Sequence, residues 1–173
     1  MLISNEMNAA INQQIGREFS SSLQYVAIAA YFDADHLSEL AAHFFQQADE
    51  ERMHAMRFVR YVLDAGGQVE IPEIPAVRSR FANAEEAVRS ALDGEITVTK
   101  EINSLVDLAS RQNDHITQTF LQWFVTEQLE EVSSTDALFS VIRRAGEGGL
   151  LHVEEYLARR RPQARASAGA VAE

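Results

Sequence analysis

The chain has 173 residues, of which 46% are hydrophobic and three are proline, and its net charge at pH 7 is −11. This composition predicts one globular domain with a substantial core. No apolar run reaches the roughly 20 residues that cross a bilayer, and the N-terminus lacks a signal peptide, so we expect a cytoplasmic protein without a membrane partner. The chain has no cysteine, which excludes disulfides, iron–sulfur clusters and thiol nucleophiles and leaves carboxylates and imidazoles as metal ligands, while the acidic charge argues against binding to nucleic acid.

A first helix is predicted to begin after Ser4 or Asn5, either of which can cap it. Its inward-facing row alternates in steps of four and three residues and contains Ile11, Ile15, Glu18, Ser22, Tyr25 and Ala29. This spacing predicts that Glu18 points into the core. The polar sequence at 33–36 ends the helix, and the next helix follows within a few residues, so the two should be antiparallel neighbours.

The second helix carries an acid and a histidine on its apolar face, at a spacing suited to metal ligands. Glu51 lies seven residues from both Phe44 and Phe58, which places it on the apolar row with Leu37 and Val62. His54 follows three residues later and shares its face. Gly66 and Gly67 are a signal for the end of this helix.

A long connection from Gly66 to about Arg80 has two prolines and no helical period, and it has room to run the length of a bundle. The third helix begins at Asn83, with Glu86 placed as in a capping box. Its apolar row is again interrupted by an acid and consists of Val88, Glu95, Ile102 and Ala109.

A fourth helix follows Asn113 or Asp114 and carries two neighbouring rows, each with an acid predicted to be buried. One row contains Phe120, Glu127 and Ser134, and the other contains Phe124, Glu131 and Leu138. After the glycines at 146–149, the sequence LLHVEEYLARRR predicts a short fifth helix. We expect residues 1–161 to form the domain and residues 162–173 to form a flexible C-terminal tail.

Four glutamates therefore lie near the middle of four different helices: Glu18, Glu51, Glu95 and Glu131. Like charges in a low-dielectric core repel strongly, so the cluster needs shared protons or divalent cations. Together with His54 these carboxylates suit a pair of iron or manganese ions better than zinc, which prefers fewer and softer ligands. Glu51 is the natural candidate for a ligand that bridges both ions.

The chain resembles the non-haem bacterial ferritins over nearly its whole length up to about Arg161. The resemblance is carried by REFSSSLQY, EERMH, Glu95 and QWFVTEQLEE. It implies an all-α, ferritin-like four-helix bundle with one long crossover and a short fifth helix. It also implies a ferroxidase that oxidises Fe(II) with dioxygen or peroxide at a di-iron centre inside each subunit, and that stores ferric mineral in a hollow shell of 24 subunits.

The resemblance also implies roles for individual residues. One iron site of the family matches Glu18, Glu51 and His54, and the second matches Glu51, Glu95 and Glu131. Gln128 matches a glutamine beside the second metal that orients water or dioxygen, and Tyr25 matches a tyrosine that is hydrogen-bonded near the first site. Glu50, Glu127 and Glu130 match a third iron site, the alternative being that these acids form a solvated surface. Trp123 is either a core residue or a nearby electron donor.

Other di-iron bundles fit less well. Bacterioferritins bind haem through a methionine two residues before the histidine of the second helix, whereas this chain has Arg52 there, so no haem is predicted. The alternative function is a rubrerythrin-like peroxidase or oxygenase acting on a small molecule, but such proteins usually have two Glu-x-x-His motifs. A helical bundle without metal is a third possibility. The remaining histidines show no ligand partner at helical spacing and are interpreted as surface or interface residues: His36, His43, His115 and His152.

Overall fold

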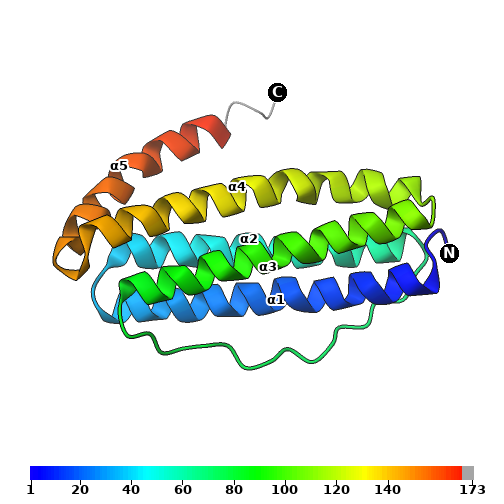
Figure 1. Ribbon diagram of the computed structural model, residues 1–173, viewed down its shortest axis with the longest axis horizontal. Helices are drawn as coiled ribbons and strands as arrows, with labels where there is room; N and C mark the ends of the chain where they lie inside the picture. Colours follow the sequence, from blue (N-terminus) through cyan, green and yellow to red (C-terminus); the bar gives the residue numbers. More distant parts are fainter. Residues whose placement is uncertain (169–173) are drawn as a thin grey trace.

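The computed structural model describes residues 1–168, with side chains described through Arg159. This part of the chain forms α1 (Asn5–Ala34), α2 (Ser38–Asp64), α3 (Ala84–Arg111), α4 (His115–Ala145), the short 3-10 helix η1 (Glu147–Gly149) and α5 (Leu150–Ala168), with no strand among the described residues. The four long helices lie side by side in a bundle, and α5 projects at an angle from one end of it (Figure 1). The predicted all-α class is confirmed.

The helices begin where the predicted caps lie. Ser4 Oγ accepts a hydrogen bond from the N–H of Met7 at 3.0 Å, and Asn83 Oδ1 accepts one from the N–H of Glu86 at 2.8 Å. The Glu86 carboxylate accepts from the N–H of Ala82 and not from that of Asn83. The predicted capping box therefore forms in one direction only.

Helices α1, α2 and α3 all end in the same type of turn. The residue after each C-cap has a positive φ, 59° at His36, 73° at Gly66 and 54° at Asn113. The N–H of the following residue reaches the carbonyl five positions earlier, at 2.9 to 3.0 Å: Leu37 to Phe32, Gly67 to Val62, and Asp114 to Ala109. These Schellman turns stop each helix sharply and satisfy its last carbonyls.

The crossover between α2 and α3 runs along the outside of the bundle from one end to the other (Figure 1). Its path follows α1, because the Gln24 side chain bonds to the backbone N–H and carbonyl of Arg78. Gly16 is required where the crossover passes closest, since a Cβ there would lie 2.4 Å from Pro72 Cγ. The predicted length and course of this connection are confirmed.

The core has two apolar clusters, one in each half of the bundle. One includes Phe32, Phe44 and Phe139, and the other includes Phe58 and Phe124. The inward-facing rows predicted for α1, α2 and α3 are buried throughout. A belt of buried polar side chains belongs to neither cluster and lies near the middle of the long helices.

Helix α5 is attached to the bundle through both apolar and polar contacts. Leu150 and Val153 are buried. The Glu154 carboxylate accepts hydrogen bonds from the N–H groups of Glu39 and Leu40 at 2.8 Å each, and so caps the N-terminus of α2, where Leu37 supplies no side-chain cap.

Helix α5 continues past Arg161 to Ala168. The division into a domain over 1–161 and a flexible tail over 162–173 stays a prediction. The rest of the predicted tail, residues 169–173, lies outside the described residues. No helix in the described part of the chain is both long enough and apolar enough to cross a membrane.

Candidate metal centre

All seven side chains predicted for the di-iron centre are buried, with exposed fractions between 1% and 5%: Glu18, Tyr25, Glu51, His54, Glu95, Gln128 and Glu131. They come from four helices whose apolar rows continue on both sides of them. Because burying a carboxylate costs several kcal/mol when it has no partner, the belt must be stabilised by protons or cations.

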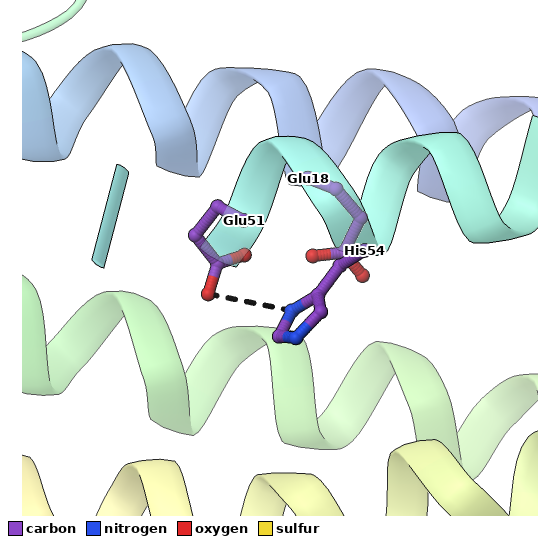
Figure 2. A group of neighbouring side chains, drawn as sticks. All are labelled: Glu18, Glu51 and His54. Carbon is purple, nitrogen blue, oxygen red and sulfur yellow. Dashed lines mark ion pairs between the residues drawn. The ribbon is translucent and has the colours of Figure 1, made fainter. Parts of the chain in front are cut away.

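Glu18, Glu51 and His54 form the tightest group. Each offers a ligand atom, and these atoms all lie within 4.8 Å of one another. Figure 2 shows Glu51 and His54 on α2 and Glu18 reaching toward them from α1, with His54 Nδ1 3.6 Å from Glu51 Oε1. Gln14 donates to Glu18 Oε1 at 2.9 Å, whereas Glu18 Oε2 is buried and has no hydrogen-bond partner.

The electrostatics of this group fit a cation. Burial raises the pKa of Glu18 well above its ordinary value, and the charge of Glu51 raises it further. Burial likewise raises the pKa of Glu51, with Glu95 as the next cause. A divalent ion would stabilise the ionised forms of both carboxylates. It would also bind the Glu18 oxygen that has no hydrogen-bond partner. Two carboxylates and one imidazole are a donor set suited to iron.

Glu95 is held by hydrogen bonds from two helices. The Tyr25 hydroxyl donates to Glu95 Oε1. Gln128 Nε2 donates to Glu95 Oε2 at 3.1 Å and to Thr99 Oγ1 at 3.2 Å. The resemblance places Tyr25 near the first iron site, whereas its hydroxyl bonds to Glu95, a residue of the predicted second site.

Glu131 completes the buried belt. Burial, followed by the charge of Glu95, raises the pKa of Glu131 to about 8. Among the described residues, however, only Glu18, Glu51 and His54 bring three ligand atoms within 4.8 Å. The charges of Glu95 and Glu131 therefore act on the triad by raising the pKa of Glu51. The two residues are not part of a preformed set of ligand atoms.

The three acids predicted for an accessory site are less buried. Glu50 is half-buried and accepts hydrogen bonds from Gln46, at 2.8 Å, and from Gln47. Glu127 is half-buried and Glu130 is exposed, so the expectation that both rows of the fourth helix carry a buried acid is wrong for Glu127. Its place in a heptad row leaves Glu127 half-buried, while Glu131 in the neighbouring row is buried. Burial raises the pKa of Glu127, and the charges of Glu130 and Glu50 contribute, so the three acids influence one another.

Several residues at the site were not predicted from the sequence. Gln14 and Thr99 each lie four residues from a glutamate of the belt, so helical spacing could have found them. Arg57 has no such signal, since its guanidinium lies 3.9 Å above the ring of Trp123 on another helix. Trp123 in turn meets the His54 ring edge-on, at 5.4 Å between ring centres.

Comparison with known proteins agrees with this architecture. The family model described as a ferritin-like domain matches residues 8–145. Ferritin BfrB of Mycolicibacterium smegmatis is 44% identical over 157 residues, which cover 91% of this chain and 86% of that protein. The bacterial non-heme ferritin of Bacteroides fragilis is 32% identical over 159 residues, 92% of this chain and 100% of that protein. The solved open pore ferritin of Archaeoglobus fulgidus has a TM-score of 0.87 and 34% identity, and covers 90% of this chain and 96% of that one.

Proposed function

Because the chain belongs to the ferritin family, among the bacterial non-haem ferritins, we propose that it oxidises Fe(II) at an intrasubunit di-iron centre and stores the ferric product as mineral in a hollow shell. The observation that carries the proposal is the buried group of Glu18, Glu51 and His54, whose ligand atoms lie within 4.8 Å of one another. An apolar core would not retain such a group without a use for its charge.

Fe(II) is the substrate in this proposal. Glu18, Glu51 and His54 bind one ion, and Glu51, Glu95 and Glu131 bind the other, so that Glu51 serves both. The raised pKa values of Glu18 and Glu51 mean that these carboxyls bind protons readily in the metal-free protein and release them when iron enters. Two Fe(II) ions give two electrons to one dioxygen, which takes up two protons to become hydrogen peroxide. The ferric products then leave for the mineral.

Tyr25 and Gln128 act on Glu95 in this scheme. The Tyr25 hydroxyl donates to one oxygen of Glu95 and the Gln128 amide to the other. These bonds fix the orientation of the carboxylate before iron binds, as outer partners of metal ligands generally do. Gln128 is also placed to bond to water or dioxygen when Glu95 turns toward an ion.

Electron microscopy of the protein before and after iron loading tests the storage function. A hollow particle with a dense centre after loading supports storage. A rubrerythrin-like peroxidase would hold only the iron of its di-iron sites, so particles that gain no dense core would favour that alternative.

The Glu51→Ala variant tests the site. It should lose rapid Fe(II) oxidation, measured by stopped-flow absorbance, because both ions lose a ligand, while the fold is retained. The metal-free variant should be at least as stable as the parent, since a buried acid has been removed. Asp49→Ala is a matched control, because it removes an exposed acid two residues away on α2. Unchanged oxidation in Glu51→Ala would place the reaction elsewhere.

A further inference from the structure

Helices α2 and α4 face each other across a row of side chains. Arg57 of α2 lies over Trp123 of α4, at 3.9 Å from the ring centre. One turn back along α2, His54 meets the same ring edge-on, at 5.4 Å between ring centres. Further toward the start of α2, Gln46 lines a cavity together with Glu130 of α4. The two helices are therefore antiparallel, and the start of α2 lies beside the end of α4. The accessory acids occupy the middle of this row.

The Arg57 end of the row carries positive charge, which is unfavourable for a cation. The Arg57 guanidinium is permanently charged and stacks on an aromatic face. Trp123 precedes Glu127 by one turn of α4, so the guanidinium lies next to the accessory acids. A cation bound at the accessory acids would meet both positive charge and the bulk of Trp123 in this direction.

The other end of the row opens into a cavity of about 500 Å³ between α2, α4 and α5. Its polar wall includes Glu39, His43, Gln46, Glu130 and Ser134. Glu130 thus belongs both to the accessory acids and to this cavity. Since one water molecule occupies about 30 Å³ of liquid, the cavity has room for a cation with its first shell of water.

The polar groups of the cavity suit a hydrated cation. Burial lowers the pKa of His43 to about 4, so its ring is neutral at physiological pH and can accept a hydrogen bond from a metal-bound water. Glu39 and Glu130 supply negative charge. In the part of the chain that the structure describes, no three of these groups bring ligand atoms within 4.8 Å. A cavity of about 500 Å³ lined by these groups suits an ion that keeps its first shell of water.

We propose that this cavity is an exit chamber, in which iron that leaves Glu130 is held as a hydrated cation on its way to the mineral, while Arg57 on Trp123 prevents movement in the opposite direction. The chamber role rests on the proposed ferroxidase and storage function. Cation binding in the chamber does not depend on that function and can be measured separately.

Hexaamminecobalt(III) is the probe for binding, because it resembles a hydrated cation but does not exchange its ligands. Calorimetric titration of the assembled, iron-free protein should show one more bound ion per subunit in the parent than in two chamber variants. Ala137→Leu fills the space, and His43→Leu removes the neutral acceptor. His115→Leu is the matched control, since His115 is exposed at the start of α4, away from the cavity, and it should bind as the parent does.

Repeated iron additions test the exit role. With two Fe(II) per subunit, both chamber variants should oxidise the first addition at the parent's rate, because neither residue is a ligand of the centre. Later additions should be oxidised several-fold more slowly, because ferric product leaves slowly. If the parent and the two chamber variants bind the cobalt probe equally, the cavity is not a cation site. If the variants lose probe binding but oxidise later iron additions at the parent's rate, the cavity has no role in iron exit. A parent that fails to oxidise even the first addition contradicts the ferroxidase and the exit role together, and the cobalt titration then decides cation binding alone.

Discussion

At the scale of single residues, the centre is a set of acids that are buried in the same part of the core. Glu18 and Glu51 have pKa values raised chiefly by burial, and Glu131 titrates near pH 8 for the same reason. Each pKa unit corresponds to about 1.4 kcal/mol of difference between the two protonation states. The metal-free protein is therefore strained most when these acids are ionised.

The stability of the metal-free protein should fall as pH rises. The pKa of Glu131 is about 8 in the folded protein and near the ordinary 4.5 when unfolded. Between these values the folded state binds more protons, so the free energy of unfolding decreases with pH, by an amount on the order of 5 kcal/mol for Glu131. Urea unfolding at several pH values from 5 to 8 measures the slope. Glu131→Gln should make the slope shallower, with Glu18 and Glu51 still contributing, and a variant with the parent's slope would contradict this assignment.

Glu130→Ala tests the accessory site. Glu130 is exposed and lies outside the buried triad, so the variant should still bind and oxidise two irons per subunit. Either the ratio of iron oxidised to oxygen consumed or the rate of later turnovers should change, because Glu127 and Glu50 alone hold a cation less well. Iron titration and an oxygen electrode give both quantities. If neither changes, the three acids are only a solvated surface.

At the scale of the helices, side-chain periodicity predicted much of the fold. The spacing of apolar residues located Glu18, Glu51 and Glu95 correctly in the core, because burial follows directly from position on a helix. Contacts between distant helices could not be predicted in this way. The stacking of Arg57 on Trp123 depends on how α2 and α4 face each other, and so does the half-buried position of Glu127.

Helix α5 shows the same limit. A row of apolar residues predicted the helix, but its attachment depends on Glu154, whose carboxylate reaches two N–H groups of α2. Nothing in the local sequence distinguishes Glu154 from its neighbour Glu155, which forms an exposed ion pair with Arg159. Which of the two acids caps α2 is decided by which face of α5 meets the bundle.

Glu154→Ala should loosen α5. The variant leaves two N–H groups at the start of α2 without an acceptor, at a cost of roughly 1–3 kcal/mol. Hydrogen exchange should speed up in the first turn of α2 and along α5, while the middle of the bundle remains protected. Glu155→Ala is the control, because exposed ion pairs contribute at most about 1 kcal/mol. Equal protection in the two variants would mean that Glu154 does not anchor the helix.

At the scale of the whole molecule, the single chain exposes large apolar side chains that suggest further contacts. Leu151 on α5 is 73% exposed, and Leu23, Val26 and Ile71 are also exposed on α1 and the crossover. Scattered apolar residues are ordinary on protein surfaces, but these lie on two regions that the bundle itself leaves uncovered. Contacts between copies of the chain would bury them.

The protein should assemble into a shell of 24 copies of the 19.3 kDa chain. Light scattering or native mass spectrometry measures the mass of the particle directly. Leu151→Glu should weaken assembly, because it places a charge on the exposed face of α5, while the bundle remains folded by circular dichroism. A parent that is a monomer or dimer at working concentration would contradict the storage function.

The long crossover divides the bundle into two helical hairpins, α1 with α2 and α3 with α4, and the helices pack most extensively within each pair. The tight triad of Glu18, Glu51 and His54 lies entirely in the first hairpin, whereas Glu95, Gln128 and Glu131 lie in the second. Local hairpins form faster than contacts between distant segments. Each half of the centre can therefore take shape during folding before the halves meet, and iron that reaches the first hairpin early would favour its docking with the second.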